Sequence, residues 1–224
     1  MLSQAIGSYL PAAIAVALSP IPIIAVVVVL ATPRARTVGP AFAIGWIVGL
    51  AAVSVIVVTI AHGAKDPASA TATGVNWFEV GFGVLFLVMA ARQWRKRPKH
   101  GEPAEMPSWM ASVDTITPVK GLVLGLALSA ANPKNLALTA AAAASIAQAG
   151  LSGGEQAVVL VVLVLLGSLG IIAPVAIYFA MGDRAAPVLD EWKAWLAANN
   201  ATVMTVLFVV FGAVLIGKGI GGLS

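Results

Sequence analysis

The 224-residue chain contains no cysteine and only two histidines. Without cysteine it cannot form a disulfide, a thiol-redox pair or a thiolate metal site. Neither His62 nor His100 has a carboxylate neighbour at a ligand-like spacing. The sequence also shows no Ser/His/Asp arrangement and no phosphate-cradling glycine loop. These absences argue against a metal site, a bound cofactor and an enzymatic function.

Charged residues are scarce, at 10% of the chain, whereas hydrophobic residues make up 60%. This composition excludes an ordinary soluble domain. The formal net charge of +4 does not indicate a nucleic-acid partner, because the basic residues cluster in a few loops between apolar segments. We therefore predict an all-α integral membrane protein with a single transmembrane domain over residues 1–224.

Six apolar segments are long enough to cross a bilayer, which needs roughly 20 residues. They cover residues 5–31, 38–62, 75–92, 118–150, 155–181 and 201–221. The first and fourth are too long for one straight span, and both contain proline. We expect each of these two helices to be broken into half-helices, or to form a re-entrant hairpin.

Ten of the 13 Lys and Arg residues lie in the loops after the first, third and fifth segments, with Arg92 and Lys120 counted at the segment ends. They are Arg34, Arg36, Arg92, Arg95, Lys96, Arg97, Lys99, Lys120, Arg184 and Lys193. The positive-inside rule places these loops in the cytoplasm and both termini outside. The second half is then inverted relative to the first, which predicts two inverted three-helix repeats. They cover about 1–95 and 118–224, with a cytoplasmic loop at about 92–117.

Two motifs place proline and polar residues inside apolar segments. The first is Ser19-Pro20-Ile21-Pro22, and the second is Asn132-Pro133-Lys134-Asn135, preceded by Ser129. Proline frees backbone carbonyls that hydrocarbon cannot satisfy. A lysine at membrane depth costs about 2.5–3.5 kcal/mol, so it usually faces a bundle interior or a wet cavity. Broken helices at corresponding positions of two halves are a pointer to a transporter binding site.

We therefore predict a substrate site where the two breaks meet. Its residues are Ser19, Pro20, Pro22, Ser129, Asn132, Pro133, Lys134 and Asn135. The one central charge is positive, which favours an anionic group at Lys134, or a role for Lys134 as a gate or proton-linked switch. Two structural alternatives stay open: Lys134 neutralises the carbonyl end of a half-helix, or it extends to the interface.

Two further patterns concern packing. Residues 45–49 form a GxxxG pattern, which allows two helix backbones to approach closely. We expect this approach within one chain, with a homodimer contact as the alternative. Residues 187–196 begin with proline, carry apolar residues at helical spacing and include Trp192 and Trp195. This stretch predicts an interfacial helix on the cytoplasmic face.

The two proline motifs resemble those of the LysE superfamily of exporters, whose amino-acid branch carries a Pro-Gly-Pro-like motif and an Asn-Pro-Lys motif. Here Ile21 replaces the central glycine, which weakens an amino-acid exporter assignment. Six spans, an over-long first helix followed by Arg34 and a basic central loop look most like the GAP branch. Its members are the peptidoglycolipid- and sulfolipid-addressing proteins of actinobacterial envelopes. The resemblance implies movement of a lipid or glycolipid, in some cases beside a larger lipid transporter.

We therefore predict a bacterial inner-membrane transporter of a lipid or glycolipid for envelope assembly, with an anionic headgroup favoured. One alternative is a small-solute exporter of amino-acid type. The other is a non-transporting accessory protein of a lipid export or synthesis machine. A closed aqueous cavity would favour a small solute, whereas an opening towards the bilayer would favour a lipid.

Overall fold

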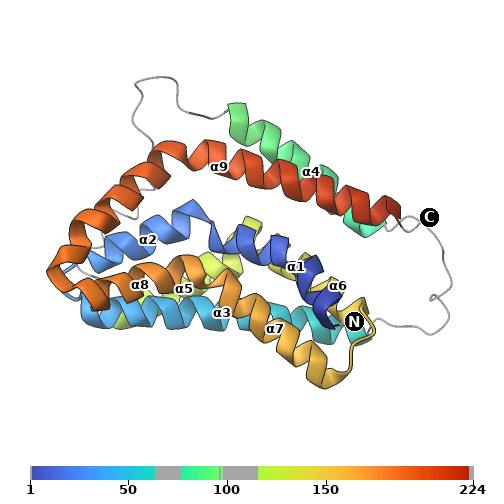
Figure 1. Ribbon diagram of the computed structural model, residues 1–224, viewed down its shortest axis with the longest axis horizontal. Helices are drawn as coiled ribbons and strands as arrows, with labels where there is room; N and C mark the ends of the chain where they lie inside the picture. Colours follow the sequence, from blue (N-terminus) through green and yellow to red (C-terminus); the bar gives the residue numbers. More distant parts are fainter. Residues whose placement is uncertain (1, 64–76, 96, 98–115, 222–224) are drawn as a thin grey trace. The chain divides into compact units, whose positions relative to one another are not determined.

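The computed structural model describes residues 2–63, 77–95, 97 and 116–221 (Figure 1). Every regular element within these residues is a helix, which confirms the predicted all-α class. Contacts divide the chain into two compact units. One unit falls within residues 1–62 and 105–197, and the other within 63–104 and 198–224.

The first apolar segment is broken at its proline motif, as predicted. It forms α1 (Leu2–Ala17) and α2 (Pro20–Leu30), with a bend of 41° between them. The backbone N–H of Ser19 donates to Val16 O instead of the carbonyl four residues earlier. Both prolines of the motif lie in the first turn of α2, where backbone N–H groups have no intrahelical acceptor. The break therefore removes few hydrogen bonds from either half-helix.

The fourth segment is also broken, again as predicted. α5 (Pro118–Leu126) continues into a π-helical turn, η3 (Ala127–Ala131), and α6 (Pro133–Gln148) begins after Asn132. A π turn widens the helix and is often found at functional sites. Asn132 has extended backbone, so the chain leaves the helix for one residue before α6 starts.

A third break lies in the fifth segment, between α7 (Gly153–Gly167) and α8 (Leu169–Met181), with a bend of 57°. Ser168 Oγ donates to Val164 O at 2.6 Å, and such back-bonding bends helices. Pro174 inside α8 removes a further backbone donor. The sequence predicts breaks only in the first and fourth segments, so this third break corrects that prediction.

The half-helices of the first unit pack in pairs. α1 contacts α6 and α7, and α2 contacts α8. α3 (Ala35–Gly63) packs closely on α5, because a Cβ added to Gly45 would overlap the carbonyl oxygen of Leu122. A Cβ on Gly125 would overlap that of Phe42 in the same way. The GxxxG pattern of α3 is therefore used within the chain, as expected.

The second unit contains α4 (Trp77–Arg95) and the C-terminal part of α9 (Ala185–Gly221). The Phe86 and Phe208 rings stack with their centroids 5.7 Å apart. α9 follows the short 3-10 helix η4 (Gly182–Arg184) and is continuous over 37 residues. The stretch predicted as a separate interfacial helix is therefore the start of α9, which corrects that expectation.

Two helices, α3 and α9, are long and apolar enough to cross a membrane. The bent pairs α1–α2 and α7–α8 raise this number to as many as four among the described residues, if each pair is one span. The chain is thus a helical membrane protein. Six spans, inverted repeats and the orientation stay predictions, and most of the predicted loop at about 92–117 lies outside the described residues.

Candidate functional site

The first and fourth segments meet at their breaks, where Asn135 links the two. Ser19 Oγ, from the first break, donates a hydrogen bond of 3.0 Å to Asn135 Oδ1. Asn135 Nδ2 donates to Leu128 O in the π turn, also at 3.0 Å. Both Ser19 and Asn135 are buried, at 2% and 0% exposure. A buried amide that bridges two broken backbones stabilises both, since an unsatisfied carbonyl in hydrocarbon costs several kcal/mol.

Lys134 reaches across to the end of α1. Its Nζ lies 3.1 Å from the carbonyl oxygen of Ala15 and the side chain is only 4% exposed. This carbonyl lacks its usual helical donor, because Ser19 N–H turns to Val16 O. The ammonium therefore binds a backbone oxygen that the break has released. The geometry matches the alternative in which Lys134 neutralises the carbonyl end of a half-helix.

The remaining predicted residues shape the second break. Asn132 is the N-cap of α6, and its Oδ1 accepts a hydrogen bond from Lys134 N–H at 3.1 Å. Pro133 takes the first position of the helix, where its missing N–H does no harm. Ser129 is fully buried and donates to Leu126 O at 3.0 Å, and a Cβ on Gly49 of α3 would overlap its hydroxyl.

The structure thus brings Ser19, Lys134 and Asn135 together through direct bonds that join the two breaks. It places Pro20, Pro22 and Pro133 in first turns, where they create the breaks without contributing a polar group. Direct substrate contact by any residue of this set stays a prediction.

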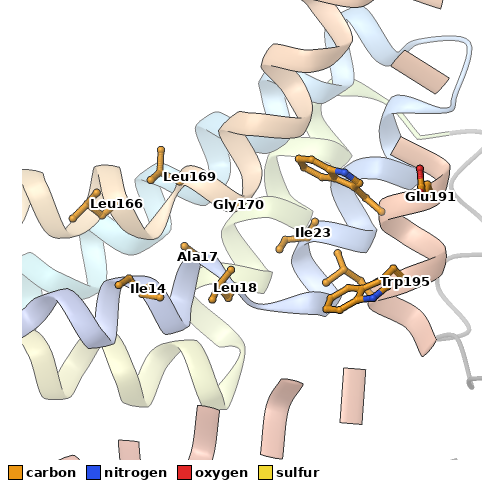
Figure 2. Close-up of a pocket in the computed structure, with 11 residues that line it drawn as sticks. Ile14, Ala17, Leu18, Ile23, Leu166, Leu169, Gly170, Glu191 and Trp195 are labelled. Carbon is orange, nitrogen blue, oxygen red and sulfur yellow. The ribbon is translucent and has the colours of Figure 1, made fainter. Parts of the chain in front are cut away.

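An apolar pocket of about 710 Å³ lies beside the first break (Figure 2). Its lining comes from α1, α2, α7, α8 and the start of α9, with none from α6. The lining residues are Ile14, Ala17, Leu18, Ile23, Leu166, Leu169, Gly170, Glu191, Trp192, Trp195 and Leu196. Glu191 is the only charged residue among them. The first break therefore faces polar partners on α6 and, separately, an apolar space.

Sequence reasoning missed this pocket. Gly170 is central to it, because a Cβ there would overlap the carbonyl oxygen of Ala17, so α1 and α8 touch through their backbones. The one signal in the sequence was the pair of tryptophans at 192 and 195, which marks an interfacial surface but not its partner helices.

A family model described as "Sap, sulfolipid-1-addressing protein" matches residues 9–221. The chain therefore belongs to this family, which confirms the resemblance to the addressing-protein branch. No curated protein and no solved structure matches the chain.

Proposed function

We propose that the chain moves a lipid with an anionic or glycosylated headgroup across the bacterial inner membrane, without enzymatic chemistry. One observation supports this most directly: a single helix break borders both a buried ammonium group and an apolar pocket. A lipid needs both kinds of surface, one for its headgroup and one for its chains. The name of the family, which refers to the addressing of a sulfolipid, supports an anionic cargo.

The headgroup would meet Lys134, Asn132 and Asn135. In the present arrangement the Lys134 ammonium is bound to Ala15 O and buried, so it is shielded from any headgroup. Access requires the contacts from α6 to Ala15 and Ser19 to separate. We propose that this separation is the conformational step of transport, with an anionic group taking the place of the backbone carbonyl as the partner of Lys134.

A small-solute exporter is the less favoured alternative, because the pocket offers a polar solute almost no hydrogen-bonding group. A non-transporting accessory protein is the second alternative. It would use the same pocket to hold a lipid for a larger lipid transporter, and would not move it.

Reconstitution separates lipid transport from both alternatives. The purified protein is placed in vesicles that contain fluorescent phosphatidylglycerol or phosphatidylcholine analogues, and dithionite then reduces the label in the outer leaflet. Lipid transport predicts additional loss of fluorescence, faster for the anionic lipid, from the inner leaflet. An accessory protein gives the loss of protein-free vesicles. A small-solute exporter would also leave the lipids in place.

The proposed orientation can be tested directly, because the chain has no cysteine of its own. Single cysteines at Gly101 and Asp190 should be protected from an impermeant thiol reagent added outside intact cells, and one at Ser69 should react. Labelling of the Gly101 position from outside would show that the orientation is the reverse of the one proposed.

A further inference from the structure

The pocket has two chemically different ends. In Figure 2, Glu191 and Trp195 lie at one end, and Ile14 and Leu166 lie at the other. Leu18 and its neighbours on the first break lie between them. Trp195 is 57% exposed, and indole rings in membrane proteins concentrate at the headgroup level. Glu191, the only charged residue of the lining, lies at the same end, so we assign this end to the membrane–water interface.

We infer that the pocket binds one acyl chain of a membrane lipid, with the lipid's polar end beside Trp195 and its methyl end towards Ile14 and Leu166. This inference rests on the proposed function and names the part of the site that recognises the substrate's tail. If the loops after the first, third and fifth segments are cytoplasmic, the tryptophan end opens towards the cytoplasmic leaflet. The lipid would then be loaded from the cytoplasmic leaflet.

The lining selects this occupant. A pocket of about 710 Å³ lies within the range of roughly 300–1,000 Å³ that accommodates a ligand of drug size. Water is a poor occupant of the pocket, because a buried water needs polar partners. Only Glu191, at one end, supplies a charged group. The apolar molecule available at membrane depth is a lipid chain, and its headgroup would stay at the wet end.

The position of the pocket also connects the tail to the headgroup site. Ala17 and Leu18 line the pocket, and Ser19, the next residue, bonds to Asn135. Gly170 holds α8 against the carbonyl oxygen of Ala17 on the same wall. A chain entering the pocket therefore contacts the backbone segment whose movement would release Lys134.

Photolabelling tests the inference without requiring transport. The full chain is placed in nanodiscs of phosphatidylethanolamine and phosphatidylglycerol, the latter carrying a diazirine at the end of one acyl chain. After illumination, labelled peptides are mapped by mass spectrometry. We expect label on the segments around Ile14 and Leu166. A diazirine near the glycerol should instead label the segment around Trp195.

Two variants fill the pocket from two different elements: Leu169→Trp from α8 and Leu18→Trp from the first break. Each should reduce the label at least about tenfold. Excluding only about two methylene groups of the acyl chain from the pocket would weaken lipid binding by this factor. Leu165→Trp is the matched control, because Leu165 and Leu169 are each 51% exposed and Leu165 does not line the pocket. Size-exclusion profiles identify any variant that has not folded, and the other pocket-filling variant then provides the test.

The two ideas can fail separately. If the label is unchanged in both pocket-filling variants, or is spread evenly over exposed helix faces such as Val48 and Val55, the acyl-chain site is wrong even in a protein that transports lipid. A label that maps as expected in a protein that moves no lipid supports the site and overturns the transport proposal. Cross-links from pocket residues to a second copy of the chain would instead assign the pocket to a dimer contact.

Discussion

At the second break, the hydrogen-bond partners come from the same apolar segment. At the first break, they are side chains of the other broken segment. At the second break, Asn132 caps α6 and Asn135 binds the Leu128 carbonyl nearby. At the first break, Ser19 makes no side-chain cap for α2. Its hydroxyl and the released Ala15 carbonyl both bond to residues of α6.

This difference indicates which part is able to move. The start of α6 carries its own cap and needs nothing from α1 or α2 to stay helical. The junction of α1 and α2 takes both its side-chain hydrogen bonds from α6, so we expect it to keep its present geometry only while α6 stays against it. We therefore expect α6 to act as the fixed element and the first break to be the part that opens.

The largest loss of stability is expected for Asn135→Leu, because this amide serves both breaks. The change leaves the Leu128 carbonyl without its side-chain donor and removes the acceptor of Ser19, at about 1–3 kcal/mol for each buried group. Unfolding in mixed micelles of mild detergent and SDS measures the change. Transport in vesicles should fall as well.

Asn200→Leu is the matched control for Asn135→Leu. The Oδ1 of Asn200 is buried without a hydrogen-bond partner, so replacing it removes no bond at that atom. We expect an unfolding free energy that is unchanged or slightly higher. Equal destabilisation by the two variants would show that Asn135 does not link the breaks.

Lys134→Met should have a large effect on transport and a small one on stability. It removes a bond to a charged group, worth about 1.5–3 kcal/mol, but it also relieves an insertion cost of about 2.5–3.5 kcal/mol. These terms nearly cancel, so folding should change little. If Lys134 binds the anionic headgroup, most transport of phosphatidylglycerol is lost.

Two further variants serve as controls for Lys134→Met. Lys193→Met removes a surface charge paired with Asp190 at 2.6 Å and should preserve transport. Lys134→Arg should be partly active, because a planar fork replaces a compact ammonium. A folded Lys134→Met protein that transports at the parental rate would show that Lys134 does not bind the headgroup. Its role would then be structural, through contacts such as the bond with Ala15 O.

The sequence predicted both proline breaks because proline has a local, well-defined effect on a helix. It predicted the close approach of α3 through Gly45 for a similar reason, since a missing Cβ acts wherever the residue lies. The bond from Lys134 to Ala15 O was not predictable in this way. Every residue carries a backbone carbonyl, so the sequence cannot indicate which one a distant lysine binds.

The pocket and the third break were missed for a related reason. Serine is common in membrane helices, so Ser168 gives no clear sign of a 57° bend, and Pro174 lies six residues further on. The pocket needs three distant stretches, around residues 14–23, 166–170 and 191–196. Their apolar residues satisfy any helix that faces lipid or a neighbour, so only the fold shows that they enclose one space.

The smallest effect, and the sharpest test of the asymmetry, concerns Ser19. Ser19→Ala alone should cost about 0.5–1.5 kcal/mol, the net value of one hydrogen bond. Because that bond ends on Asn135, the cost should almost disappear when Asn135 is already Ala, which corresponds to a coupling energy of at least about 0.5 kcal/mol. Thr117→Ala provides the comparison, since Thr117 caps α5 by accepting from Lys120 N–H, whereas Ser19 bonds to Asn135. Its effect should therefore simply add to that of Ser19→Ala. All five variants, three single and two double, are measured by the same micelle unfolding assay. Additive energies for Ser19 and Asn135 would mean that the first break is stable without α6, and that release of α6 does not open it.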